Sequence, residues 1–214
     1  QPGYAPLSIL GVPKHNITFA IDHASKLAVV ESSGDAYPQV PLGPGILSRS
    51  LFLGHMALDT KRDRIVMTVR YGRRQLMTYD LESGKWSRLN SLPTEGMIHA
   101  LGYIEALDTL YGLLREGQSG QVVSLVRFDA AGKQLESLKL STPILVGAHA
   151  RPEFDGPPPS VHDVNGLLVV TTPAYLDYDK VRRAHIHVIE PSTGEVLYSG
   201  ESQPHDGQQP IELE

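Results

Sequence analysis

Short apolar runs separated by turn residues make up most of this chain. Runs in which nearly every residue is apolar predict strands that are buried on both faces; they cover residues 27–30, 65–69, 110–114 and 167–170. Runs in which apolar and polar residues alternate predict strands with one wetter face; they cover residues 75–79, 123–128 and 185–189. Helical periodicity is almost absent, so the pattern predicts an all-β protein.

Three of the alternating runs end in the same kind of turn. Each has an acidic residue, a short polar or small stretch and then a glycine, after which a strand pattern resumes; the three glycines are Gly84, Gly132 and Gly194. The acidic side chain can accept backbone N–H bonds within the turn, and glycine adopts a positive φ without strain. Each turn therefore predicts a hairpin between an inner and an outer strand.

The strand and turn pattern repeats along the chain. The aligned first strands of the repeats contain Thr18, His55, His99 and His162, at spacings of 37 (18 to 55), 44 (55 to 99) and 63 (99 to 162). A period in the forties with two strand pairs in each unit is typical of β-propeller blades. A Pro-rich insertion at residues 141–160 accounts for the long third interval.

One stretch carries a resemblance to known repeats. It reads Ala-Leu-Asp, four residues, Arg-Ile-Val-Met-Thr, and later Leu-Met-Thr-Tyr-Asp-Leu-Glu-Ser-Gly-Lys-Trp. It resembles the propeller repeats of bacterial surface-layer and quinoprotein-like proteins and, more loosely, kelch repeats. The resemblance is best over residues 54–90, weaker over 98–140 and 160–200, and poor over 15–53. Because the kelch Gly-Gly pair and the Trp-Asp dipeptide of other propellers are missing, the resemblance implies an architecture and no catalytic residues.

The predicted fold is a single β-propeller domain over residues 1–214, with about four blades of antiparallel strands. The blades are expected at roughly 15–53, 54–97, 98–146 and 160–200. Residues 4–12 can lend a closing strand to the last blade, which would favour a closed ring. The alternative is an incomplete or half propeller that a partner completes, because an open propeller leaves strand edges unpaired.

Composition excludes several classes of protein. Hydrophobic residues make up 41% of the chain and charged residues 20%, as in globular domains. The net charge of −5, from 19 basic and 24 acidic residues, argues against a nucleic-acid partner. No apolar run approaches the roughly 20 residues that cross a bilayer, so we expect no membrane insertion. The absence of cysteine excludes disulfides, thiolate zinc sites and thiol nucleophiles.

The chain opens at Gln1 and not at methionine. A cleaved signal peptide is one explanation, and it would place the protein in the periplasm or outside the cell. The other explanation is a domain taken from a longer chain.

Histidines are the first candidates for chemistry. His55, His99 and His162 are predicted on the inner strands of successive blades, which line the central channel of a propeller. Three imidazoles can hold a transition metal and leave a position open for water or substrate. The arrangement is similar in geometry to the axial histidines that hold iron in carotenoid-cleaving oxygenases. The alternative is that these histidines bond the backbone of neighbouring blades. For His185 and His187 we expect a half-exposed strand.

The Pro-rich insertion holds a second group of polar residues. His149 and Arg151 are candidate binding residues, because a guanidinium can bind a carboxylate or phosphate with two hydrogen bonds. Glu153 and Asp155 can ligate a hard cation or act as a general base. Asp163 follows His162 directly, so we expect this loop and the channel to be neighbours. The alternative is an ordinary solvated loop.

These observations leave three hypotheses about function. The first is a non-enzymatic recognition or scaffold module outside the cytoplasm, which binds a protein or a glycan through its loop face. The second is a metal-dependent enzyme that acts on a small molecule at the channel mouth, with the three channel histidines as ligands and Glu153 or Asp155 as the base near a metal-bound water. The third is a fragment that self-associates or meets a partner through open blade edges.

Overall fold

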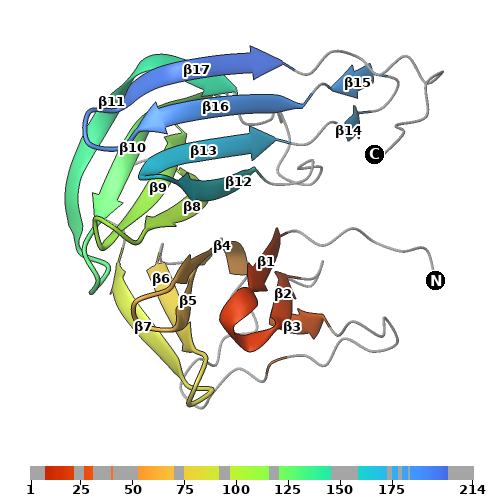
Figure 1. The fold of residues 1–214 in the computed structure, drawn as a ribbon, viewed down its shortest axis with the longest axis vertical. Coiled ribbons are helices and arrows are strands. Elements are labelled where there is room, and N and C mark those ends of the chain that lie inside the picture. The colour runs from red at the N-terminus through yellow and green to blue at the C-terminus, as the bar shows by residue number, and fades with distance from the viewer. Residues whose placement is uncertain are drawn as a thin grey trace.

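The computed structural model describes residues 8–21, 27–30, 40, 53–69, 75–91, 97–115, 121–145, 159–172, 175–177, 180–182 and 184–201. Four of their antiparallel sheets follow one another along an arc, as the blades of a four-bladed β-propeller, and a fifth, small sheet has two strands (Figure 1). The described residues contain no α-helix and a single 3-10 turn, η1 (Pro13–His15). The prediction of an all-β propeller is confirmed.

Chain order and spatial order agree within each blade. The first sheet contains β1 (Ser8–Val12), β2 (Ile17–Ile21) and β3 (Leu27–Val30). The second contains β4 (Leu53–Asp59), β5 (Arg64–Val69), β6 (Gln75–Asp80) and β7 (Trp86–Ser91). The third contains β8 (Met97–Ile104), β9 (Thr109–Arg115), β10 (Gln121–Phe128) and β11 (Gln134–Leu145). The fourth contains β12 (Ser160–Val164), β13 (Leu167–Thr172), β16 (His185–Glu190) and β17 (Glu195–Glu201), and β14 (Tyr175–Asp177) pairs with β15 (Lys180–Arg182) beside it.

The first strand of each blade lies nearest the centre of the arc. β1 contacts β4, β4 contacts β8, and β8 contacts β12, so neighbouring blades meet along their first strands. β8 and β12 approach closely at Gly102, where an added Cβ would lie 2.4 Å from Cγ1 of Val161. A side chain at residue 102 would therefore force the third and fourth blades apart.

Two kinds of hairpin turn recur from blade to blade. The turn between the first and second strands has a residue in the left-handed region, where asparagine and aspartate are the most tolerated residues after glycine; these residues are Asn16, Asp63, Asp108 and Asn165. The turn between the last two strands of the second, third and fourth blades has a glycine with φ near +70°; these are Gly84, Gly132 and Gly194. The three predicted glycine hairpins are confirmed.

The first blade begins earlier than the repeat alignment predicted. Thr18 lies in β2, the second strand of its blade, so it is not equivalent to the histidines of the first strands. The mostly apolar run of β2 was taken for the first strand of the blade, and β1, which is equally long, was not recognised. The predicted closing strand at residues 4–12 is wrong for residues 8–12, because β1 pairs with β2 in the first sheet.

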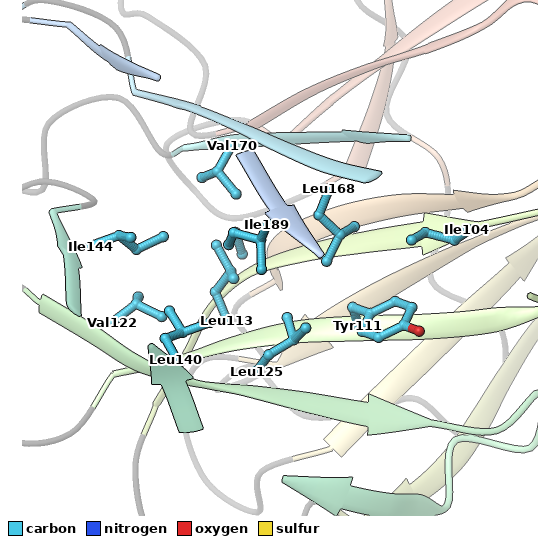
Figure 2. Packing of buried hydrophobic residues seen from close by; sticks show 11 residues of the cluster. Ile104, Tyr111, Leu113, Val122, Leu125, Leu140, Ile144, Leu168, Val170 and Ile189 are labelled. Carbon is cyan, nitrogen blue, oxygen red and sulfur yellow. The ribbon is translucent and has the colours of Figure 1, made fainter. Parts of the chain in front are cut away.

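Among the described residues, the core consists of three apolar clusters, one between each pair of neighbouring blades. Residues of both sheets meet between the first and second blades in the cluster of Val12, Phe19, Ile21, Leu27, Met56, Ile65, Met67 and Met77. The next cluster joins the second and third blades through Ala57, Val66, Leu76, Ile98, Leu101, Tyr103, Leu110, Leu114, Val126 and Phe128. Figure 2 shows the last cluster, in which Leu168, Val170 and Ile189 of the fourth sheet lie among side chains of the third, such as Leu113 and Leu125.

Candidate binding face

The turns between the first and second strands of the four blades lie at one end of the sheets. We call this surface the hairpin-tip face and define it by residues 13–16, 60–63, 105–108 and 164–166. Hydrogen bonds and ion pairs connect each turn to a neighbouring one. The face is therefore continuous across all four blades.

The first and second blades are joined through Asp63. Nζ of Lys14 donates a hydrogen bond to Oδ2 of Asp63 at 2.7 Å. Nε2 of His15 lies 2.9 Å from Oδ1 and 2.8 Å from Oδ2 of the same carboxylate. The hydrogen bond from Lys14, followed by the hydrogen bond and charge of His15, holds the pKa of Asp63 below its ordinary value. The ionised carboxylate is thus the form that links these blades.

The second and third blades are joined through Asp108. Nη1 and Nη2 of Arg62 donate to Oδ1 and Oδ2 of Asp108 at 2.6 and 2.8 Å, and the hydroxyl of Tyr103 donates to Oδ1 at 2.8 Å. The two Arg62 bonds, and then the Tyr103 bond, hold the pKa of Asp108 well below its ordinary value. Burial and the bond to Asp108 raise the pKa of Tyr103. Because the Arg62 guanidinium donates two hydrogen bonds to the same carboxylate, it also fixes the angle between the two turns.

A buried carboxylate holds Arg62 in place. Asp59 is almost fully buried, and its Oδ2 accepts a 2.8 Å hydrogen bond from Nε of Arg64 and lies 3.3 Å from Nη1 of Arg62. The backbone N–H of Arg62 donates to Oδ1 of Asp59 at 3.2 Å. Arg64 also donates to the backbone oxygen of Ala130, in the outer turn of the third blade. Asp59 thus orients two arginines that both reach the next blade.

Asp163, a predicted binding residue, joins the third and fourth blades. Its Oδ1 accepts the backbone N–H of Gly166 at 2.9 Å, which closes its own hairpin. Its Oδ2 accepts the backbone N–H of Glu105 at 3.3 Å. Glu105 in turn accepts a 2.7 Å bond from the hydroxyl of Thr60 in the second blade. Both oxygens of Asp163 thus accept hydrogen bonds that hold the hairpins in place.

One position of the inner turns carries a charged or polar side chain in two blades and an aliphatic side chain in the other two. The alignment on apolar runs did not show this difference. The residue directly before the left-handed position is His15, Arg62, Leu107 or Val164 in successive blades. His15 and Arg62 bond the next blade, whereas Leu107 is 48% exposed and Val164 is 47% exposed. Aligning the chain on the turn residues, and not on the apolar runs, would have shown this substitution. The structure thus places two exposed aliphatic side chains on adjacent tips.

Acid is expected to weaken the links between blades. A carboxylate with a lowered folded-state pKa stabilises the fold above its unfolded pKa of about 4, and this contribution is lost as the pH falls through the folded-state value. Asp63 and Asp108 have lowered pKa values, so the free energy of unfolding should fall below about pH 4. Urea unfolding across this range should show a shallower fall in Asp108→Asn. An unchanged fall in both Asp108→Asn and Asp63→Asn would contradict this assignment.

The structure brings together two of the three predicted channel histidines. The ring centroids of His55 and His99 lie 5.6 Å apart, on β4 and β8. His162 is exposed on β12 and lies two residues from the tip end of its strand, whereas His55 and His99 lie four and five residues from theirs. This difference of two to three residues in distance from the tip corresponds to roughly 7–10 Å along the strand. Within the ranges that the structure describes, no three His, Asp or Glu side chains form a group suited to a metal.

The other predicted site residues lie outside the described residues. These are His149 and Arg151, the predicted binding residues of the insertion, and Glu153 and Asp155, the predicted catalytic carboxylates. Their roles remain predictions. In the part of the chain that is described, no helix is long and apolar enough to cross a membrane.

His185 and His187 lie on the same face of β16. His187 is buried against the third blade, and its Nδ1 lies 2.9 Å from Oγ of Ser199. Its ring stacks on that of His185 with centroids 6.0 Å apart and planes 7° from parallel. β16 is a half-exposed strand, as expected, with His187 on its buried face and Ile186, which is 47% exposed, on the other.

Comparison with known proteins shows the fold. No protein-family model and no curated sequence matches this chain. A solved protein of unknown function from Bacteroides thetaiotaomicron matches with a TM-score of 0.58 and 17% identity, over 90% of this chain and 42% of that one. The chain has a β-propeller fold. The structure of a nidogen/laminin complex matches this propeller with a TM-score of 0.58 and 11% identity, over 93% of it and 64% of the matched chain.

A third similar structure is hydrazine synthase from Kuenenia stuttgartiensis, with a TM-score of 0.55 and 9% identity over 92% of this chain and 49% of that one. At such low identities the similarity concerns the fold alone. The propeller described here spans between 42% and 64% of the length of these three structures.

Proposed function

We propose that this chain is a non-enzymatic propeller module that recognises a protein partner through its hairpin-tip face. The observation that carries the proposal is the pair of exposed aliphatic side chains, Leu107 and Val164, on adjacent tips. They occupy the position at which Arg62 ties the second blade to the third. Exposed apolar groups on a rigid support are typical of interaction sites.

The links between blades support this use of the face. The hydrogen bond between the N–H of Glu105 and Asp163 joins the two turns that carry Leu107 and Val164. A surface held by such bonds loses little conformational entropy when a partner binds, which favours affinity. Glu105 and Asp163 lie on the same two turns as the apolar pair, and many protein interfaces combine an apolar centre with a polar rim.

A protein fits this surface better than a glycan. Leucine and valine offer no hydrogen bonds to hydroxyl groups, and their desolvation is most favourable against apolar side chains. A protein that inserts an apolar residue between the two tips would bury both. The predicted loop around residues 149–155 lies outside the described residues, so the proposal rests on the tips.

Site-specific cross-linking can test this function. A photo-reactive residue would be placed at Leu107 and, as a control, at Leu135, which is 53% exposed on the outer strand β11. Cross-linking in the producing cells, followed by mass spectrometry, would identify partners that attach at the tip and not at the control position. Each partner would then be purified and its affinity measured for the wild type and for Leu107→Asp, Val164→Asp and Leu135→Asp.

The expected result is a loss of affinity of about 30-fold or more for both tip variants, as for residues at the centre of an interface, and none for Leu135→Asp. Thermal unfolding of all three variants would show that they fold alike. Equal binding by wild type and tip variants would refute a role of the tips in recognition. Binding of a glycan, measured on an immobilised glycan panel and lost in the tip variants, would refute the choice of a protein partner.

A further inference from the structure

The inner turn of the fourth blade is shorter than those of the other blades. Val164 pairs with Leu167, so Asn165 and Gly166 alone connect β12 with β13. Both residues have a positive φ, 54° and 83°, as in the tight hairpins for which Asn-Gly is the preferred sequence. The inner turns of the other blades span residues 13–16, 60–63 and 105–108.

The glycine makes the asparagine before it open to attack. The backbone nitrogen that follows an asparagine can attack its side-chain amide, and a Cβ on the residue that carries this nitrogen hinders the approach. Gly166 has no Cβ, and no atom of the described residues lies within 4 Å of the place where one would be. Asn165 is exposed, so water reaches its side chain. Of the asparagines in the chain, only Asn165 precedes a glycine.

A carboxylate lies at the proton that the attacking nitrogen loses. Oδ1 of Asp163 accepts the N–H of Gly166 at 2.9 Å, which is within the reach that a general base needs. Oδ2 of Asp163 accepts the N–H of Glu105, so the third blade holds this carboxylate in its orientation. The tip thus combines an exposed amide, an unhindered nitrogen and a base.

We propose that Asn165 is a site of spontaneous deamidation in the folded chain, and that Asp163 accepts the proton in the first step. The nitrogen of Gly166 forms a bond to Cγ of Asn165, and its proton passes to Asp163 and then to the departing amide nitrogen. The bond between Cγ and Nδ2 breaks, and ammonia leaves. Water then opens the resulting succinimide at either carbonyl carbon, which gives an aspartyl or an isoaspartyl residue. Asparagine and water are thus converted to an acidic residue and ammonia, without oxidation or reduction.

The reaction changes the hairpin-tip face. Both products carry a negative charge directly after Val164, and the isoaspartyl form also lengthens the backbone of the turn by a methylene group. Burying this charge against a partner is costly, so recognition through Val164 should weaken as the protein ages. This consequence rests on the proposed function, whereas the reaction itself requires no partner. The two can therefore fail separately.

Asn16 is a matched control within the same chain. It is exposed, has a φ of 51° and occupies the left-handed position of the inner turn of the first blade. The next residue is Ile17, whose branched side chain packs against the cluster between the first and second blades. In the folded chain, Asn165 should therefore convert at least about tenfold faster than Asn16.

Ageing of the purified chain at mildly alkaline pH, followed by peptide mapping, measures both conversions. Mass spectrometry detects the replacement of an amide NH2 by OH, and an isoaspartyl methyltransferase labels the isoaspartyl product. Gly166→Ala adds a Cβ at the attacking residue and should slow the conversion of Asn165 at least about tenfold. Asp163→Asn keeps an oxygen that can accept the N–H of Gly166 but is not basic, so it should slow the conversion by at least about the same factor.

Three results would contradict the proposal. Equal rates at Asn165 and Asn16 in the folded chain would overturn it. Conversion of Asn165 that occurs only in urea would also overturn it, because the folded hairpin would then protect the amide. Unchanged or faster conversion in Asp163→Asn would overturn the role of Asp163, because a carboxylate that only holds the hairpin would protect the amide. Circular dichroism of each variant checks that a changed rate does not come from loss of the fold.

Discussion

Replacing Phe128 by alanine is expected to lower the free energy of unfolding by about 3–5 kcal/mol. Phe128 ends β10 and is fully buried in the cluster between the second and third blades. Its Cε2 lies 3.2 Å from the place where a Cβ on Gly112 would be, so the ring fills space that β9 leaves free. Alanine would open a cavity that strands on both sides cannot fill without moving.

Urea unfolding of the wild type and of Phe128→Ala measures this loss. Leu135→Ala is the control, because its side chain is half-exposed and its loss should change the free energy by no more than about 0.5 kcal/mol. A loss below about 1 kcal/mol for Phe128→Ala would show that the two blades do not depend on this contact.

Replacing Gly194 by alanine is expected to lower the free energy of unfolding by about 2–4 kcal/mol. Gly194 has a φ of +76°, and a Cβ there would lie 2.9 Å from the backbone oxygen of Lys139. The backbone oxygen of Gly194 accepts a 3.0 Å hydrogen bond from the N–H of Ser141, in the outer strand of the third blade. Alanine would thus strain its own turn and push the outer strands of two blades apart.

Gly166 provides a matched control. It has a φ of +83°, and no atom lies within 4 Å of the place where its Cβ would be. Gly166→Ala should therefore show the cost of the left-handed conformation alone, about 1–2 kcal/mol. The difference between the two variants in urea unfolding measures the contact between blades. Equal losses for Gly194→Ala and Gly166→Ala would show that this contact contributes nothing.

The two turn families explain how far the sequence could predict this fold. The outer hairpins were predictable, because only glycine adopts their backbone conformation at low cost, and Gly84, Gly132 and Gly194 mark them in the sequence. The inner hairpins use asparagine or aspartate, which are common elsewhere in the chain. Their repeat was therefore missed, and Thr18 was placed one strand too early in its blade.

The candidate site was less predictable than the fold. Asp163 was recognised as a polar residue next to a strand, but its bond to the N–H of Glu105 depends on how two blades meet. The histidines show the same limit: His55 and His99 come together, whereas His162 is exposed two residues from the tip end of β12. Leu107 and Val164 resemble ordinary strand residues until the turns are superposed.

The sequence by itself determined the strands, their turns and the propeller class, since these follow from local patterns of polarity and from the backbone freedom of single residues. Tertiary structure decided which residues meet. Arg62 reaches Asp108 and Lys14 reaches Asp63 only because neighbouring sheets lie along one arc. His187 and Ile186 alternate along β16, and only the packing against the third blade decides that His187 is buried while Ile186 is 47% exposed. Exposure and contact depend on what lies opposite a side chain, and no local pattern contains that information.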